Sequence, residues 1–544
     1  MKYFVRLFIL CFCCTVVLAQ NKLGYIWPLD TPCVITGNYG ELRPNHFHAG
    51  IDFSTNGSIN KNVYAVEDGY ISRIRVSSGG YGKCIYITHP GNKVTVYAHL
   101  NKFGLKAAEL VKAEQLALKK FEVELLPAPG RIKVKKGEVV GLSGNSGGST
   151  GPHLHFEIRD EKSETPLNPL EFYTIPDRLA PVAEAVAFYD LSDTLSPQII
   201  RSARLSGAST PTFILQQSEI GLAFFGYDLN YSRGNKNNVY QAELQLDGKL
   251  IYSHRLRTID FADGRFVNEF HDVHAGKKYQ KCFIPTLYPP RFFDASKNKG
   301  HLSFKDTLYH QVRLTLRDES GNATVKDLVL KSFKKQTLAT VALNDPLFVD
   351  CRKDFLYNGK ELKLFIPAGT LYRSAQLKID NKLAEARKLE ILPLLNLRSV
   401  YVLGFILPQT LKNNNEKLVL TGGGGAVPGQ VRNDSVYFYL KNTGSFSLQF
   451  DLAAPTIRTQ IAQSRLKNMR NFSSFSFIIR DELSGINSYN VYVNNQWVIA
   501  EYDAKNHKLT YYFDEDTPKG PLDFRVDVTD RVGNKKEFSY KLQR

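Results

Sequence analysis

An apolar, strand-like run, "HLHFEI" at residues 153–158, carries two histidines one residue apart. Alternate residues of a β-strand point to the same face of a sheet, so we expect His153 and His155 to project together into one small volume. Two imidazoles on an ordinary core face would cost burial energy without a compensating contact. A metal site or a proton-transfer site would explain the pair, and either would need further polar residues at the same place.

A second candidate group lies in "HAGID" at residues 48–52. His48 and Asp52 are four residues apart, a spacing that returns both side chains to one face in either a strand or a helical turn. Imidazole and carboxylate are good zinc ligands, and a catalytic zinc takes three protein ligands and leaves the fourth position for water. One histidine of the 153–155 pair would be the third ligand. The other would lie beside the water, where a general base belongs.

Three motifs, in the order "NHFHAGIDF", "VYAHL" and "GNSGGSTGPHLHFEI", carry a family resemblance, with a "VYAVEDGYI" hairpin between the first two. Residues 30–172 closely resemble the LytM/lysostaphin-type zinc metallopeptidases, which cut peptidoglycan cross-links. The resemblance implies a compact antiparallel β-sheet with a groove across its face. It implies one zinc ion per chain, bound by three residues: His48, Asp52 and His155.

The same resemblance assigns the catalytic pair, His153 and His99. His153 would take the proton of the attacking water, and His99 would stabilise the oxyanion by its charge or a hydrogen bond. Zinc would lower the pKa of the water to about 7 and polarise the scissile carbonyl. No serine or cysteine nucleophile is required.

Other residues of the region have plainer interpretations. His46 also forms an H-x-H pair with His48 and faintly resembles a cupin metal motif, but that motif prefers Glu and does not predict the second H-x-H. We therefore interpret His46 as a groove or structural residue, and His89, at a turn, as a hairpin cap. No Gly-Lys-Ser/Thr follows the glycine-rich stretch, so it is not a phosphate loop. Its glycines are expected to form a tight loop that lets an extended peptide approach the groove: positions 141, 144, 147, 148 and 151.

Strands must position these residues. Residues 63–76 and 84–100 are expected to be strands, with a hairpin turn at Pro90-Gly91-Asn92. An insertion at about residues 104–128 has helical spacing and helix-forming residues. We predict strands again in the stretches around residue 140 and after residue 153.

The length of 544 residues indicates three or four domains. The fold class expected is mainly β, with an N-terminal antiparallel sheet that carries a helical insertion, followed by about three β-sandwich domains. A weak repeat, D-x-x-G-N at Asp318 and at Asp530, and turn signals about every ten residues indicate immunoglobulin-like sandwiches after the first domain. The repeated acidic turns could suggest calcium, but a structural turn is the preferred interpretation. The expected division is a signal peptide at 1–19, the peptidase domain at 20–176, sandwiches at 177–336 and 453–544, and a β-rich domain at 337–452.

The first 19 residues have a basic start, Lys2 and Arg6, and an apolar run too short to span a bilayer comfortably. We interpret them as a signal peptide cut after Ala19 or Gln20. The protein is therefore expected to be exported to the periplasm or cell envelope, where association with the outer membrane is an option. The four cysteines that remain could form disulfides, with Cys33–Cys84 and Cys282–Cys351 as conceivable pairs, or could equally serve as small buried apolar residues.

The formal net charge is +17, or +15 once the two basic residues of the leader are removed. A basic exported protein suits an anionic polymer or an envelope protein as partner of its C-terminal domains, although the charge could equally serve solubility alone. No nucleic-acid-reading module is evident.

The hypothesis that follows is an exported zinc metalloendopeptidase that hydrolyses peptide stems or cross-bridges of peptidoglycan. Two alternatives are a non-catalytic scaffold that activates a separate cell wall amidase, and a zinc peptidase with a non-wall protein substrate. The presence of all three ligands and both catalytic histidines favours the enzyme over the scaffold. The bond that would be cut is not readable from the sequence.

Overall fold

The computed structural model shows a mainly β protein, as expected. It describes residues 24–30, 34–173, 175, 177–192, 197–205, 207, 209–229, 234–294, 299–333, 345–461, 463–466 and 468–544. The expected signal peptide and Cys33 lie outside these residues. Within them, no helix is both long and apolar enough to cross a membrane.

The first domain is built on an antiparallel sheet in the order β1-β4-β13-β8-β7-β6-β10, with β11 and β14 paired to β6 and β13. Its core lies on one face, where Phe53, Tyr97 and Phe156 are fully buried and in ring contact. A small sheet, β5-β12-β9, and the pair β2-β3 complete it. The strands are β1 (Ile35–Gly37), β2 (Leu42–Arg43), β3 (His46–Phe47), β4 (Ile51–Ser54), β5 (Asn62–Tyr64), β6 (Gly69–Val76), β7 (Lys83–His89), β8 (Lys93–Leu100), β9 (Lys102–Phe103), β10 (Val123–Leu125), β11 (Lys133–Val134), β12 (Val139–Leu142), β13 (His153–Asp160) and β14 (Pro166–Leu167), and the 3-10 helix η1 (Pro169–Glu171) follows.

The insertion forms a shorter helix than its spacing predicts. Helix α1 (Leu105–Leu118) ends where Lys119 adopts a left-handed conformation, with φ of 49°. Phe121 and Val123 are buried beyond that point, and β10 pairs with β6. Burial at the sheet edge therefore outweighs helix propensity in the second half of the insertion.

The second domain is a sandwich of two sheets that share one hydrophobic core, with Phe224 on one sheet and Leu314 on the other both fully buried. One sheet contains β15 (Val182–Asp190), β16 (Gln198–Arg204), β18 (Glu219–Tyr227), β21 (His271–His274), β22 (Lys277–Lys281) and β24 (Leu302–Ser303). The other contains β17 (Thr212–Leu215), β19 (Gln241–Leu246), β20 (Lys249–Arg255), β23 (Phe293–Asp294), β25 (Tyr309–Arg317) and β26 (Ala323–Ser332), and η2 (Phe261–Phe266) and α2 (Val267–Phe270) lie between β20 and β21.

The third domain is one eight-stranded sheet with a two-stranded sheet beside it. Its two longest strands, β32 (Lys388–Ile406) and β36 (Ser435–Phe450), pair in two segments separated by an irregular stretch. The others are β27 (Phe348–Val349), β28 (Phe355–Asn358), β29 (Leu362–Ile366), β30 (Ala375–Gln376), β31 (Lys378–Lys382), β33 (Leu418–Gly422), β34 (Gly425–Pro428) and β35 (Gln430–Arg432), with α3 (Leu383–Ala386), η3 (Gln409–Leu411) and η4 (Asn415–Lys417).

The fourth domain is again a sandwich, of two four-stranded sheets around a shared core that includes Phe475 and Phe524. That the two sandwiches are immunoglobulin-like stays a prediction. The first sheet contains β37 (Thr456–Thr459), β38 (Ser474–Arg480), β41 (Ala500–Asp503) and β42 (Lys508–Tyr512), the second β39 (Ile486–Val493), β40 (Gln496–Val498), β43 (Pro521–Asp530) and β44 (Lys535–Gln543), with α4 (Gln463–Leu466) and η5 (Ala504–Asn506).

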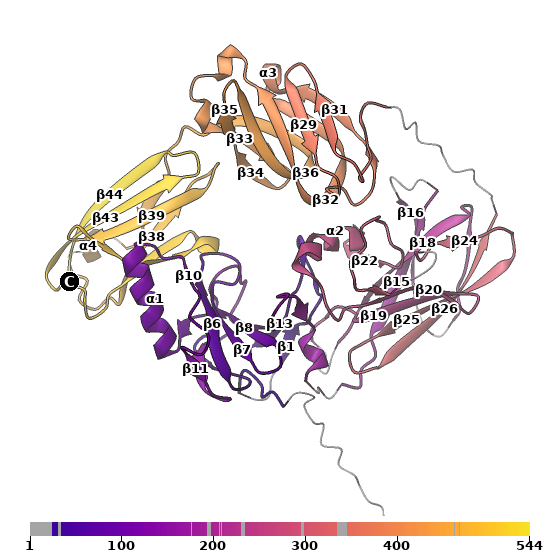
Figure 1. Ribbon diagram of the computed structural model, residues 1–544, viewed down its shortest axis with the longest axis horizontal. Helices are drawn as coiled ribbons and strands as arrows, with labels where there is room; N and C mark the ends of the chain where they lie inside the picture. The colour runs from indigo at the N-terminus through magenta and orange to yellow at the C-terminus, as the bar shows by residue number, and fades with distance from the viewer. Residues whose placement is uncertain are drawn as a thin grey trace, which may run out of the picture.

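The four domains follow one another around a ring, and the fourth returns to lie beside α1 of the first (Figure 1). Lys112 of α1 lies 2.9 Å from a carboxylate oxygen of Asp516. Lys83 of β7 lies 2.8 Å from Oε2 of Glu501. Tyr489 of the fourth domain packs against the hydrophobic core of the first. The first domain is therefore held by later parts of the chain as well as by its own core.

The repeated D-x-x-G-N motif forms the same turn in both sandwiches. The backbone nitrogens of Asn322 and Asn534 each donate to Oδ1 of the aspartate four residues before, Asp318 and Asp530, at 2.8 Å. The turn is therefore present in both sandwiches, and its purely structural role stays a prediction. Each aspartate also lies within a group of three acidic residues: Asp177, Asp228 and Asp318 in the second domain, and Asp451, Asp481 and Asp530 in the fourth.

Of the four cysteines that follow the expected signal peptide, three lie in the described part of the chain. Cys84, Cys282 and Cys351 are buried free thiols. Cys282 and Cys351 are therefore not joined by a disulfide. All three cysteines agree with the other interpretation, that they are small buried apolar residues.

Candidate metal centre

Three neighbouring strands, β4, β13 and β8, carry four of the candidate residues, and His48 lies in the segment between β3 and β4. In the register of this sheet, His155 lies opposite Asp52 on one side and Ala98 on the other. Directly opposed residues of an antiparallel pair share a face, so Asp52 joins His153 and His155 on one side of β13. The intervening Leu154 points into the core, as the alternation predicts.

His99 reaches the same face through an unusual backbone conformation. It follows Ala98, and in a regular strand its side chain would point to the opposite face. Its φ is +60°, in the left-handed region that residues with a side chain rarely adopt. The rings of His99 and His153 consequently lie next to each other at the site, with centroids 4.8 Å apart and ring planes inclined at 58°. Strained backbone of this kind is concentrated at functional sites.

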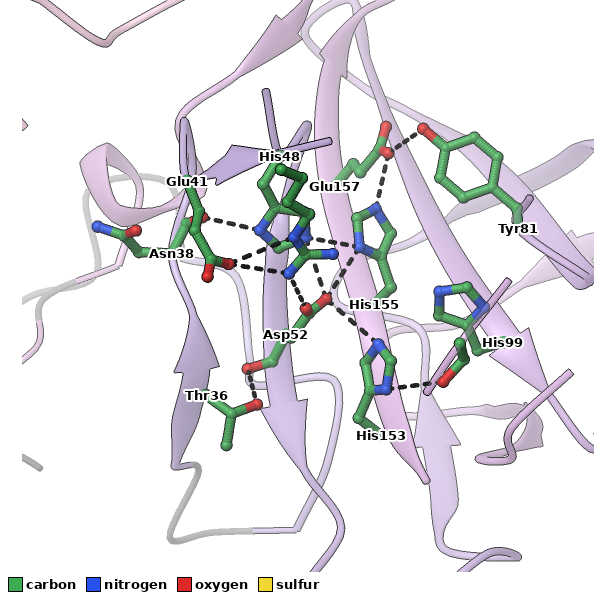
Figure 2. Close-up of polar contacts among 12 residues, drawn as sticks. Thr36, Asn38, Glu41, His48, Asp52, Tyr81, His99, His153, His155 and Glu157 are labelled. Atoms are coloured by element: carbon green, nitrogen blue, oxygen red, sulfur yellow. Dashed lines mark hydrogen bonds and ion pairs between the residues drawn. The ribbon is translucent and has the colours of Figure 1, made fainter. Parts of the chain in front are cut away.

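Three ligand atoms converge at the centre (Figure 2). Nε2 of His48 lies 2.9 Å from Nδ1 of His155 and 3.1 Å from Oδ1 of Asp52. Nδ1 of His155 lies 3.0 Å from the same carboxylate oxygen. All three residues are buried. The structure thus brings together the three metal ligands that the sequence proposed.

The remaining polar atoms of these ligands are occupied by other groups, which leaves one atom of each turned to the centre. Nδ1 of His48 donates to the backbone oxygen of Asn38 at 2.7 Å. Nε2 of His155 lies 2.8 Å from Oε1 of Glu157. Oδ2 of Asp52 accepts a hydrogen bond from Arg43. Two imidazole nitrogens and one carboxylate oxygen, each oriented from behind, are a donor set that fits zinc.

The ionisation of the site follows from burial and neighbouring groups. Burial opposes the charge of Asp52, but the charge of His48 and hydrogen bonds from the surrounding histidines hold its pKa well below the usual range. Burial lowers the pKa of His48. Burial also opposes the charge on His155, yet its hydrogen bonds to Asp52 and Glu157 raise its pKa to about 9. Asp52 therefore stays ionised and presents a charged oxygen that can bind a cation.

His153 and His99 present their Nε2 atoms to the site. Nδ1 of His153 donates to the backbone oxygen of Gly151 at 2.8 Å, and Nδ1 of His99 to that of Ser146 at 2.8 Å. Within the described residues, Nε2 of His153 is buried without a hydrogen-bond partner and lies 3.5 Å from Oδ1 of Asp52. Burial lowers the pKa of His99 to about 3. His99 is therefore neutral, and its Nε2 is a proton acceptor.

Two other histidines lie outside the centre. His46 is exposed on β3, and its Nδ1 contacts the backbone oxygen of Pro44. His89 is buried at the end of β7, where it joins the backbone oxygen of Asp68 to the hydroxyl of Thr95. Its role is structural. It contacts β8, the partner strand of the hairpin, and also the residue directly before β6.

The supporting residues were not identified from the sequence. Glu157 accepts a hydrogen bond from the hydroxyl of Tyr81 at 2.5 Å and another from Nε of Arg159 at 2.6 Å. The charge of Arg159 and the contact with His155 hold the pKa of Glu157, against the effect of burial, at about 2. Glu157 follows His155 by two residues on one strand, so the alternation that identified the histidines also predicts this carboxylate.

In the glycine-rich loop, the absence of a side chain at Gly147 allows close packing against a neighbouring loop. A Cβ at Gly147 would lie 2.3 Å from the nitrogen of Gly82, and φ at Gly147 is +71°. A Cβ at Gly151 would meet no atom within 4 Å. The glycine at 147 therefore lets residues 80–82 approach the loop, whereas the expected role in admitting a peptide stays a prediction.

Comparison with known proteins agrees with this geometry. Residues 46–117 and 128–169 match Peptidase family M23. An uncharacterized metalloprotease of Haemophilus influenzae is 39% identical over 119 residues, which are 22% of this chain and 19% of that protein. The DD-carboxypeptidase/endopeptidase Mpg of Neisseria meningitidis is 33% identical over 129 residues, 24% of this chain and 23% of the relative.

The peptidoglycan DD-endopeptidase ShyA of Vibrio cholerae is 31% identical over 140 residues, 24% of this chain and 26% of the relative. The chain thus spans about a fifth to a quarter of the length of these curated relatives. The family match lies within the first domain, where the motifs of the sequence placed it.

Proposed function

We propose that this chain, whose first domain is a peptidase family M23 domain, is a zinc metalloendopeptidase that hydrolyses the peptide stems or cross-bridges of peptidoglycan. The observation that carries the proposal is the convergence of His48, Asp52 and His155 beside Nε2 of His153, an atom without a hydrogen-bond partner among the described residues. The substrate class is supported by relatives named as a peptidoglycan endopeptidase and a DD-carboxypeptidase/endopeptidase.

The three ligands would hold the ion through His48 Nε2, His155 Nδ1 and one oxygen of Asp52. Zinc, when bound, supplies a Lewis acid that polarises a carbonyl and lowers the pKa of water. The protein supplies orientation, since each ligand is fixed by a partner behind it, and it supplies the proton acceptors.

His153 is the proposed general base. Its Nδ1 hydrogen is held by the oxygen of Gly151, so the lone pair of Nε2 is directed into the site and can accept a proton from the attacking water. His99 is held in the same way by Ser146. Because neutral His99 has no hydrogen on Nε2, it can donate to an oxyanion only after Nε2 has gained a proton. We therefore propose that the two histidines act as one proton-carrying pair.

We further propose that the protein is exported and works in the periplasm or cell envelope. The support is the leader-like start of the sequence and the substrate class. The basic charge supports an envelope protein or anionic polymer as partner of the C-terminal domains.

The test is to measure zinc content together with the release of new amine ends from cross-linked muropeptides. Wild type should hold about one zinc and cut. His155→Ala should lose zinc and activity, whereas His153→Ala should keep zinc and lose about 10²- to 10⁴-fold in turnover. A wild type that binds no zinc and cuts nothing would point to the scaffold function. A wild type that binds zinc and leaves wall peptides intact would point to a different substrate.

A further inference from the structure

A buried hydrogen-bond network joins the first and second domains behind the metal centre. Nδ2 of Asn38 donates to the backbone oxygen of Asn238 at 2.8 Å, and the backbone nitrogen of Asn238 donates to Oδ1 of Asn38 at 2.9 Å. Asn38 is fully buried, and the two residues are 200 positions apart. The second domain therefore satisfies the Asn38 amide by a reciprocal pair of hydrogen bonds.

The side chain of Asn238 holds the same segment at a second point. Its Nδ2 donates to the backbone oxygen of Gly40 at 2.9 Å. Its Oδ1 accepts a hydrogen bond from Nε2 of Gln280, on β22, at 2.9 Å. Asn238 and Gln280 are both buried. Displacement of Asn238 would leave several buried polar groups without partners, which makes the arrangement costly to disturb.

The ligand His48 depends on that segment for both its ring and its backbone. Its Nδ1 donates to the backbone oxygen of Asn38, and this bond places the lone pair on Nε2, the ligating atom. The oxygen of His48 accepts from the nitrogen of Gly40, and the nitrogen of His48 donates to the oxygen of Glu41, each at 2.9 Å. Residues 38–41 thus set where His48 points.

We propose that Asn238 of the second domain is a positioning residue for the metal centre. Asn238 holds residues 38–41, and these residues orient His48. The inference rests on the proposed function, because it concerns the affinity of that site for zinc. It gives the second domain a role in the site itself, in addition to any contact with a partner.

The experiment measures the zinc dissociation constant of the full-length chain by competition with a chelator. Partners that orient a ligand from behind typically change metal affinity 10- to 100-fold, so we expect Asn238→Ala to weaken zinc binding about tenfold. Asn168→Ala is the matched control. Asn168 is also a fully buried asparagine at this domain boundary, but its Nδ2 donates to the oxygen of Leu256 and to Glu319.

We expect Asn168→Ala to lower the unfolding temperature and to leave zinc affinity within about twofold of wild type. Equal zinc affinity in wild type and Asn238→Ala would overturn the proposal, as would an equal loss in Asn168→Ala. If Asn238→Ala does not fold, Gln280→Ala tests the same route, with a smaller loss of affinity expected. A wild type without zinc affinity would refute the proposed function itself, and the positioning role with it.

Discussion

Nε2 of His155 lies 2.8 Å from Oε1 of Glu157, a carboxylate with no exposed side-chain surface. The second Glu157 oxygen is bound by Arg159, whose side chain is 4% exposed. One buried carboxylate therefore orients a zinc ligand and neutralises a buried guanidinium.

Glu157→Gln keeps the shape of the side chain and removes its charge. We expect zinc affinity to fall about 10- to 100-fold, because the partner that orients His155 is weakened. We also expect the unfolding free energy to fall by about 3 kcal/mol, because the buried Arg159 charge loses its nearest counter-ion and keeps only the longer pair with Glu164. Chelator competition and denaturant unfolding measure the two effects. Glu161→Gln, at an exposed position just beyond the same strand, should change neither.

Gly147→Ala should disturb the loop that holds His99. The added Cβ would collide with the backbone of residues 80–82, and φ of +71° disfavours a side chain. We expect stability to fall by about 1–3 kcal/mol, together with a loss of peptidase activity. Gly151→Ala, where the Cβ has open space, is the control and should stay within about 0.5 kcal/mol of wild type. Comparable losses in both variants would contradict this account.

Lys505→Met should loosen the same loop from the other side. Nζ of Lys505, in the fourth domain, donates to the backbone oxygens of Asn145 and Gly147. Without these bonds, amide hydrogen exchange in residues 144–148 should become faster while the rest of the first domain is unchanged. Lys541→Met, at a fourth-domain lysine whose side chain is 91% exposed, is the control. Unchanged exchange in the Lys505 variant would show that the fourth domain does not restrain the loop.

Glu319→Gln should make stability less dependent on pH. Burial raises the pKa of Glu319 to about 7 from an ordinary value of 4.5. Between pH 4.5 and about 7 the folded chain therefore binds more protons than the unfolded chain. The stability that this group contributes is fully present below pH 4.5 and is lost as the pH rises through about 7. The variant should melt at a higher temperature than wild type at pH 8 and at about the same temperature as wild type at pH 4. A difference of the same size at both pH values would rule out this titration.

The candidate site was predictable from the sequence wherever strand alternation or a short spacing placed the residues. His153, His155 and Asp52 lie on adjacent strands, as their motifs require, and Glu157 follows from the same alternation. The position of His99 depends on a left-handed backbone conformation that no local pattern indicates. Asn238 could not be found, because its partner is 200 residues away and asparagine is common in surface turns.

The fold, too, could be predicted from the sequence only where local patterns indicate it. The β-rich character and the two sandwiches follow from short strands and regular turn signals, and the hairpin at residues 90–92 lies where expected. Helix α1 is shorter than its composition suggests because Phe121 and Val123 are buried at a sheet edge. The contact of the fourth domain with the first rests on ion pairs and apolar packing between distant residues, which carry no local signal.

The contact between the fourth domain and the first can form only after both have been synthesised. Lys505 and the loop atoms it binds are separated by 358 and 360 residues. Domains generally fold in turn during synthesis, beginning at the N-terminus. A nascent chain therefore carries all three proposed zinc ligands long before it carries the lysine that binds the loop beside His99. On the prediction made for Lys505, this loop gains its restraint from the fourth domain only after that domain has been made, so the first domain and its bound loop are completed at different times.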